Sequence, residues 1–339
     1  MHRLFGRSHV ISAALGLLLV LSSSAALAQY QLTNLTSDLT GKAKHTDALL
    51  KNAWGLAYSP GAPFWISDEA SGYSTLYDGM GNPQSLQVKI PPATGTAPGT
   101  PTGIVYNGSS EFKIDTWTSV FLFATLDGTI SGWSAFDPTT ALIGVKTTGA
   151  VYTGLAITSK ASGNSLFAAD AANNKVDIFD GNFNLTGSFT DPAIPAGFAP
   201  FGIQDIGGQV YVSFASTSGG AGGYIDIFTE AGVLVKHFTH GAPLNQPWGF
   251  AVAPANFGPL SNSLLISNNT TAGTINGYNL TTGKLVGTIK NTAGKTIAIS
   301  GLWGLEFGGG SASNGQKNQL FFTSGPSDTD GYFGVIVFK

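Results

Sequence analysis

A short phrase, Trp-Gly followed by an aliphatic or aromatic residue, recurs along the chain and constrains the fold more than any other feature. It reads "NAWGLAYSP" from Asn52, "QPWGFAVAP" from Gln246 and "GLWGLEFGG" from Gly301. Weaker copies, "PTGIVY", "YTGLAI" and "PFGIQD", lie between these three. The shared glycines recur roughly every 50 residues, a period typical of repeat architectures: Gly55, Gly103, Gly154, Gly202, Gly249 and Gly304.

Each copy of the phrase is followed by three more short runs that resemble strands. The second runs include "FWISD", "SLFAAD" and "SLLISN", the third include "STLYD" and "KVDIFD", and the fourth are more polar, such as "QSLQVKI". These runs are rich in Val, Ile, Phe and Tyr and are bounded by Gly, Asn and Asp, as strands are. No segment of the mature chain shows a convincing helical period, so the sequence predicts an all-β protein.

Four strands in each of six repeats predict a six-bladed β-propeller. The repeated phrase is then the innermost strand of each blade, where glycine allows neighbouring backbones to approach closely. The sixth copy ends after its third strand, while "YQLTNLT" from Tyr30 is an extra strand before the first copy. We expect this N-terminal strand to complete the last blade and close the ring. An array of β-sandwiches is the alternative fold, and it explains neither the period nor the extra strand.

The first 28 residues have the features of a signal peptide. Arg3 and Arg7 form a positive region, an apolar segment follows, and Ala26-Leu27-Ala28 matches an A-x-A cleavage site. The apolar core from Val10 to Leu21 is too short for a membrane-spanning helix, which is the alternative interpretation. We therefore expect cleavage after Ala28, one propeller domain over 29–339, and a periplasmic or extracellular location, with the mature protein a monomer without a transmembrane segment.

Charge and composition exclude several classes of function. The 16 basic residues include Arg3 and Arg7, so cleavage would leave 14 lysines against 19 acidic residues. A mature chain with no arginine and a net negative charge is poorly suited to bind nucleic acid, because such binding requires a clustered basic surface. The chain has no cysteine, which excludes thiol catalysis and disulfide bonds. No serine lies in a G-x-S-x-G nucleophile elbow.

The chain resembles an uncharacterised family of secreted bacterial six-bladed propellers that is similar to the NHL-type propellers. The resemblance extends over nearly all of 30–339 and is carried by "TDALLKNAWGLAYSP", "LFATLDGTISGW", "LFAADAANNKVDIFDGNF", "APFGIQDIGGQVYVSFA" and "QPWGFAVAPANFG". Some members of that family have a PEP-type C-terminal sorting signal, whereas this sequence ends in "GVIVFK". The resemblance implies the fold and export but no known reaction, so it supplies no catalytic residues.

Propeller geometry predicts which polar residues gather at one mouth of the channel. The loops before each first strand and after each second strand lie on the same face. We expect four residues there to be candidate ligands of a cation such as Ca²⁺, which prefers oxygen ligands: Asp68, Glu69, Asp170 and Asn268. Five more are candidates for binding a sugar-like ligand, because tryptophan offers a broad apolar face with a polar edge: Asp127, Asn173, Trp54, Trp248 and Trp303.

A structural interpretation of the same residues also exists. Asp and Asn are favoured in turns because their side chains accept backbone N–H groups, and tryptophans at this position could pack between blades. His45, His237 and His240 are the histidines of the mature chain, and the spacing of the last two in an outer strand argues against shared metal ligation. Glu306 lies in the first strand of the sixth copy, where it could face the channel.

Two classes of function therefore remain open. The first is a non-catalytic binding propeller whose partner at the channel mouth is a glycan, a small molecule or an envelope protein. The second is a divalent-metal-dependent hydrolase or lactonase, in which Glu69, Asp170 and Asn268 would converge on a metal ion at the channel mouth. The sequence favours binding, because it offers no conventional set of catalytic residues.

Overall fold

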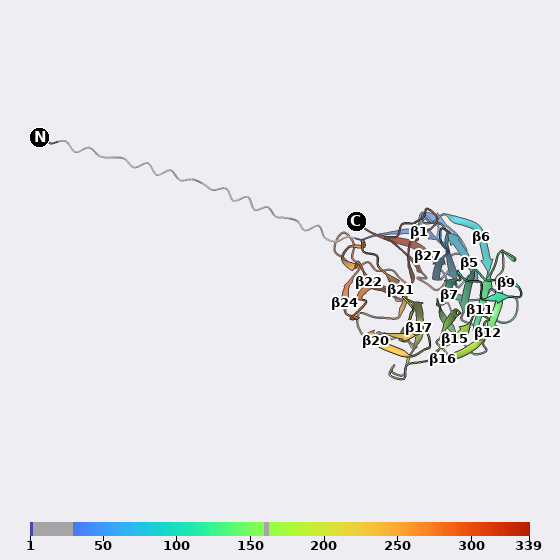
Figure 1. Cartoon of the computed structure of the whole chain (residues 1–339). Coiled ribbons are helices and arrows are strands. Elements are labelled where there is room, and N and C mark those ends of the chain that lie inside the picture. The colour runs from blue at the N-terminus through green and yellow to red at the C-terminus, as the bar shows by residue number, and fades with distance from the viewer. Residues whose placement is uncertain (3–29, 159–162) are drawn as a thin grey trace.

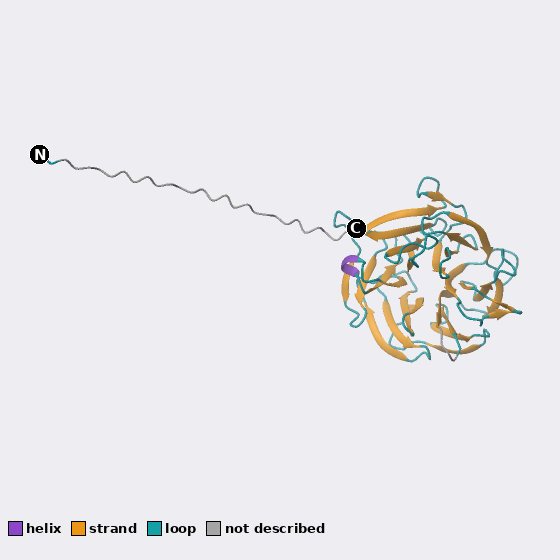
Figure 2. Cartoon of the chain, turned by 45° about the horizontal axis from the view of Figure 1, so that its top comes forward, coloured by secondary structure: helices purple, strands orange, loops and turns teal. Residues whose placement is uncertain are grey.

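The computed structural model describes residues 1–2, 30–158 and 163–339. Figure 1 shows twisted sheets arranged in a ring around a central axis. Strands and loops make up almost all of the described chain, and one short 3₁₀ helix, η1 (Gly258–Leu260), is coloured purple in Figure 2. The predicted all-β six-bladed propeller is confirmed. The predicted signal peptide, 1–28, lies outside the described residues apart from its first two.

Blades 1–5 are four-stranded antiparallel sheets whose strands run outward from the axis in sequence order. The first three blades comprise β3 (Ala53–Tyr58), β4 (Phe64–Asp68), β5 (Tyr73–Tyr77) and β6 (Pro83–Lys89); β7 (Pro101–Tyr106), β10 (Phe121–Thr125), β11 (Thr129–Trp133) and β12 (Leu142–Lys146); and β13 (Tyr152–Thr158), β14 (Ser165–Asp170), β15 (Lys175–Asp180) and β16 (Leu185–Phe189). A small hairpin, β8 (Lys113–Ile114) and β9 (Trp117–Thr118), is inserted in blade 2.

The three remaining blades have the same arrangement, except that the fourth strand of blade 6 comes from the N-terminus. They comprise β17 (Phe198–Asp205), β18 (Gln209–Ser216), β19 (Tyr224–Thr229) and β20 (Leu234–His240); β21 (Pro247–Val252), β22 (Ser263–Asn268), β23 (Ile275–Asn279) and β24 (Leu285–Thr288); and β25 (Leu302–Phe307), β26 (Gln319–Ser324), β27 (Tyr332–Phe338) and β1 (Tyr30–Ser37). Beyond β1, the two-residue strand β2 (His45–Thr46) adds a short parallel edge.

The N-terminal strand closes the ring, as the sequence predicts. β1 pairs antiparallel with β27, from Tyr30 opposite Phe338 to Ser37 opposite Tyr332. The Tyr30 hydroxyl donates a hydrogen bond to the carbonyl of Phe257 in blade 5 at 2.8 Å. The two ends of the domain therefore share one sheet, which removes the exposed edge that β27 would otherwise present.

The repeated glycines allow the innermost strands to pack directly against one another around the axis. A Cβ atom built on Gly55 would lie 2.6 Å from the carbonyl oxygen of Thr102 in the next blade. The same atom on Gly249 would lie 2.5 Å from the carbonyl oxygen of Trp303, and on Gly304 it would lie 2.8 Å from that of Trp54. No side chain fits in these spaces, which explains why the glycine is the constant element of the repeat.

The hydrophobic core is divided among the spaces between neighbouring blades. One cluster, for example, joins Ala156 and Phe167 of blade 3 to Ile203, Val212 and Phe214 of blade 4. Hydroxyl groups link adjacent blades close to the axis: Ser267 Oγ donates to the Trp303 carbonyl at 2.6 Å, and Ser213 Oγ donates to the Pro247 carbonyl at 2.7 Å. Among the described residues, no helix is long and apolar enough to cross a membrane.

Candidate functional site: the central channel

Three tryptophans meet at the axis, on the face where the innermost strands begin. The rings of Trp54 and Trp303 are stacked with centroids 3.6 Å apart, and the ring of Trp248 stands edge-on to them at 6.1 and 5.6 Å respectively. Leu126 and Phe201 pack against the three rings. We call these five residues the tryptophan plug, because they fill the centre of the ring at this face.

The indole groups in the plug are buried and mostly hydrogen-bonded. Trp54, Trp248 and Trp303 are only 5–8% exposed. Trp248 Nε1 donates to the Thr153 carbonyl at 2.9 Å, and Trp303 Nε1 donates to Asn52 Oδ1 at 3.3 Å. Each ring therefore contacts protein atoms and offers little free surface to a ligand. The predicted role of these tryptophans in ligand binding stays a prediction.

The second strands of blades 1, 3 and 5 each end in a buried polar residue. These residues are Asp68, Asp170 and Asn268. Asp68 Oδ2 accepts hydrogen bonds from the backbone and hydroxyl of Thr75, at 3.1 and 2.7 Å. Burial raises the pKa of Asp68 well above its usual range. Asp170 Oδ1 accepts the N–H of Val151 at 3.1 Å, and Asn268 Oδ1 accepts the N–H of Asn245 at 2.8 Å. Each side chain thus bonds to backbone groups in its own part of the ring.

The remaining candidates on this face also have protein partners. Glu69 Oε2 accepts the side-chain N–H of Asn52 at 2.8 Å, and burial raises the pKa of Glu69. Asp127 accepts the Thr125 hydroxyl at 2.5 Å and the backbone N–H of Ala93 at 2.6 Å. Asn173 Nδ2 donates to Asp170 Oδ2 at 2.7 Å.

The structure does not bring the predicted acidic residues of this face to one point. Within the described ranges, one group of three or more His, Asp or Glu side chains has ligand atoms within 4.8 Å of one another, and that group contains none of Asp68, Glu69 and Asp170. Their predicted role as metal ligands, with Asn268, therefore stays a prediction, and a calcium titration can test it.

The opposite end of the channel holds a cavity of about 310 Å³. It lies among the last residues of the innermost strands and is lined by Leu56, Ala57, Tyr58, Ile104, Val105, Tyr106, Ala156, Ile157, Gln204, Asp205 and Glu306. Gln204 and Glu306 also line a smaller void of about 40 Å³ that reaches Trp248. The channel is therefore blind: it opens at this face and ends at the tryptophan plug.

One position in the repeat decides the polarity of the channel. The residue two places after each repeated glycine is Ala57, Val105, Ala156, Gln204, Ala251 or Glu306. Four of these side chains are small and apolar, so Gln204 and Glu306 are the polar groups of this layer. A comparison of this position across the six copies identifies both residues from the sequence. The sequence features considered above singled out Glu306 but not Gln204.

Glu306 is a carboxylate of the channel whose pKa is shifted well above its ordinary value. Its side chain is half-buried, and burial raises its pKa to about 7. Burial and, to a smaller extent, the charge of Glu306 raise the pKa of Tyr58 to about 12. Asp205 is the other carboxylate of the cavity lining, and no lysine lines it. The cavity can therefore accept hydrogen bonds and stabilise positive charge.

Fold and channel together define a six-bladed β-propeller with a blind central cavity. No protein-family model matches the sequence. The chain is 31% identical over 337 residues to the uncharacterized protein R648 of Acanthamoeba polyphaga mimivirus, spanning 92% of this chain and 81% of the viral protein. It belongs to the same protein family as that protein. The uncharacterized protein L690 of the same virus is 29% identical over 92% of this chain and 87% of its own length.

Solved structures share the fold at low sequence identity. A streptogramin B lyase has a TM-score of 0.56 and 14% identity, covering 94% of this chain and all of its own. A gluconolactonase from Xanthomonas campestris has a TM-score of 0.54 and 14% identity, covering 91% of this chain and 90% of its own. These similarities establish the fold alone. The relatives found by sequence are viral, so they give no support to the expected membership of a secreted bacterial family.

Proposed function

We propose that the protein binds a small molecule in the open end of its central channel and that it acts without catalysing a reaction. The observation that carries this proposal is the position of Glu306, a half-buried carboxylate with a pKa of about 7 at the inner end of a cavity of about 310 Å³. A half-buried acid in a layer whose other side chains are mostly small and apolar is destabilising by itself. Such a cost is typical of sites that serve a ligand.

The lining of the cavity supports a ligand that carries an amine. Carboxylates accept hydrogen bonds and attract positive charge, and Glu306 and Asp205 are the carboxylates in the cavity lining. Tyr58 and Tyr106 line the same cavity, and tyrosine rings attract cations through their electron-rich faces. We therefore propose small organic amines, including amino sugars, as the ligand class.

A channel hydrolase is the alternative function. Two structural neighbours, the gluconolactonase and the streptogramin B lyase, are named for activities on small molecules. Along the described part of the chain, however, Asp205 and Glu306 are the carboxylates lining the cavity, and Glu69, Asp170 and Asn268 of the predicted metal set do not line it. Binding without catalysis is therefore the better-supported proposal.

Calorimetric titration with a defined panel tests the proposal. Glucosamine and spermidine are the amine probes, and glucose and gluconolactone are matched probes without an amine. We expect an amine to bind the wild-type protein and to lose at least ten-fold in affinity in Glu306→Gln. Asp115→Asn, which removes one exposed negative charge on the blade 2 hairpin, is the control and should bind as the wild type does. Equal binding by all three proteins would place the site elsewhere. Turnover of gluconolactone that depends on Glu306 would favour the hydrolase.

We further propose that the protein is exported and cleaved after Ala28. The support is the basic segment, the apolar segment and the Ala26-Leu27-Ala28 site in the sequence. Mass spectrometry of the protein recovered from its native host should find an N-terminus at or near Gln29. Recovery of the mature pool with Met1 intact would contradict export by this route.

A further inference from the structure

The third strand of each of blades 1–5 has a buried polar side chain that lies opposite a residue of the fourth strand. The pairs are Thr75 with Gln87, Ser131 with Ile143, Asp177 with Ser188, Asp226 with His237, and Asn276 with Thr288. All five third-strand side chains are buried. Blades 3 and 4 place an aspartate there, and the two aspartates have different surroundings.

In blade 3 the buried aspartate is balanced by a cation and a hydroxyl group. Lys175 Nζ lies 2.7 Å from Asp177 Oδ1. The Tyr152 hydroxyl donates to Asp177 Oδ2 at 3.0 Å. In blade 4 the residues at the positions of Lys175 and Tyr152 are Tyr224 and Pro200, so neither partner is available.

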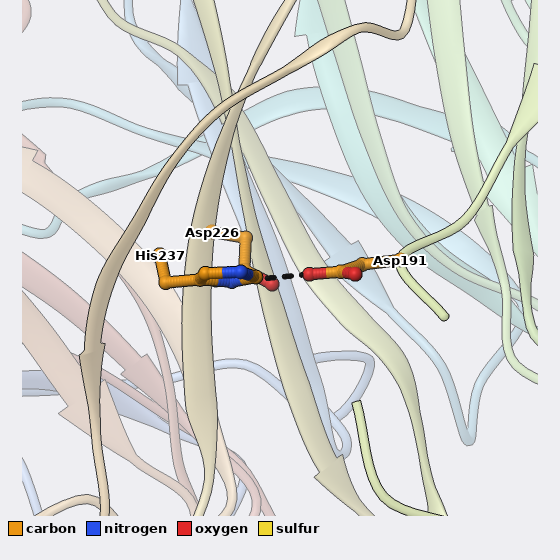
Figure 3. Close-up of side chains that lie close together, drawn as sticks. All are labelled: Asp191, Asp226 and His237. Atoms are coloured by element: carbon orange, nitrogen blue, oxygen red, sulfur yellow. Dashed lines mark hydrogen bonds and ion pairs between the residues drawn. The ribbon is translucent and has the colours of Figure 1, made fainter. Parts of the chain in front are cut away.

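In blade 4 a second carboxylate takes the place of the lysine. Asp191, from the segment between β16 and β17, points toward Asp226 and His237, as Figure 3 shows. His237 Nδ1 lies 3.1 Å from Asp191 Oδ2 and 3.1 Å from Asp226 Oδ1. The side chains of both aspartates are 2% exposed, whereas that of His237 is 54% exposed.

This arrangement places two buried carboxylates against a single imidazole ring. Asp226 Oδ2 is buried and accepts no hydrogen bond. Two carboxylates in such proximity are stable when a proton or a cation lies between them. The unpartnered oxygen of Asp226 is therefore an acceptor that a bound cation would satisfy.

We propose that Asp191, Asp226 and His237 form a zinc site between blades 3 and 4. Their ligand atoms all lie within 4.8 Å of one another, a separation that small side-chain rotations convert to bonds of about 2.0–2.2 Å to one zinc ion. The imidazole nitrogen favours zinc over calcium, which takes oxygen ligands. Three protein ligands leave a fourth position for water on the exposed side of His237. This site is separate from the central channel and does not depend on the function proposed for it.

The test is a titration of the chelator-treated protein, with any affinity tag removed, by zinc chloride. Calorimetry should give one zinc ion per chain, and saturating zinc should raise the melting temperature by a few degrees, because a ligand of the native state stabilises it. Calcium chloride at the same concentration should leave the melting temperature unchanged. Cobalt(II) in place of zinc should give a visible absorption spectrum that reports coordination by nitrogen and oxygen.

Four variants separate a metal site from general surface binding. His237→Ala and Asp226→Asn should each lower zinc affinity at least ten-fold and abolish the cobalt spectrum. His240→Ala, which removes an exposed histidine of the same strand, should bind as the wild type does. Asp177→Asn, which alters the matching position of blade 3, should also retain binding. His237 is largely exposed, so its variant should fold even if Asp226→Asn does not. Absence of one-to-one binding in the wild type, or wild-type affinity in His237→Ala, would overturn the proposal.

Discussion

The indole rings of Trp54 and Trp303 stack with centroids 3.6 Å apart and an interplanar angle of 18°, although one tryptophan begins the first blade and the other begins the last. The pair therefore joins the two blades at which the ring closes. The Thr323 hydroxyl of blade 6 also donates a hydrogen bond to the Trp54 carbonyl. Packing at the axis and strand pairing at the rim thus close the ring together.

Trp303→Ala should destabilise the protein by about 3–5 kcal/mol, the usual cost of truncating a buried tryptophan. The loss includes the stacking with Trp54 and leaves the Asn52 side chain without its indole donor. Urea unfolding followed by circular dichroism measures the change. Trp117→Ala is the control: Trp117 is 47% exposed, and its loss should cost under about 1 kcal/mol. Similar losses in the two variants would mean that the plug contributes no special stability.

Gly249→Ala should destabilise the protein by about 1–3 kcal/mol or more, because overpacking forces the backbone to move. The added methyl group would lie 2.5 Å from the Trp303 carbonyl oxygen and would separate blades 5 and 6. The control is Gly187→Ala in the outer strand β16, because a Cβ atom built there would have no neighbouring atom within 4 Å. Thermal unfolding compares the two. Equal melting temperatures would show that the innermost strands can separate without cost.

Removal of β1 should open the ring. A chain that starts after Ser37 exposes the edge of β27, so we expect a melting temperature lower by several degrees or more and aggregation through that edge. A chain that starts at Tyr30 is the control and should melt as the longer chain does. Differential scanning calorimetry and light scattering provide the readout. If the two truncated chains melt within a degree or two of each other, pairing of β1 with β27 does not stabilise the ring.

Glu306 should make the stability of the protein depend on pH. The pKa of this carboxyl group is about 7 in the folded protein and about 4.3 in an unfolded chain. Its ionisation therefore favours the unfolded state, and stability falls as pH rises from about 4.3 to 7, with no further loss from this group above that range.

Replacement of Glu306 by Gln should remove this dependence. At pH 8 Glu306→Gln should be more stable than the wild type by about 1–3 kcal/mol, a range that allows for solvent screening of a half-buried group. At pH 4 the two proteins should be equally stable. Chemical unfolding at both pH values measures the difference. A constant difference across this pH range would mean that Glu306 acts through packing rather than through its charge.

Asp170→Ala should cost about 1–3 kcal/mol, because the N–H of Val151 loses its acceptor. We expect the loss to be the same with calcium or with a chelator, since amide groups already contact both oxygens of Asp170. Melting curves of the two proteins under both conditions measure this. A rise in melting temperature with calcium in the wild type, absent in Asp170→Ala, would instead establish the predicted metal site.

Residues that recur at the same position of each repeat can be found from the sequence, and they define most of the fold. The glycines from Gly55 to Gly304 mark backbone positions where a side chain cannot fit, so their period gives the number of blades. The position of "YQLTNLT" before the first copy identifies the closing strand, because a ring with one strand missing has one place for it. Asp68, Asp170 and Asn268 could be placed on one face by the same repeat geometry.

The sequence by itself thus determined the architecture: six blades of four strands, closed by the N-terminal strand, with particular residues at particular faces. Only the tertiary structure decided which of those residues meet. Asp191, Asp226 and His237 come from different strands and a connecting segment, and nothing in their spacing indicates that they share a site. Period and alternation specify the face of a strand on which a residue lies, whereas contact between blades depends on how large side chains such as Trp54 and Trp303 fill the space between them.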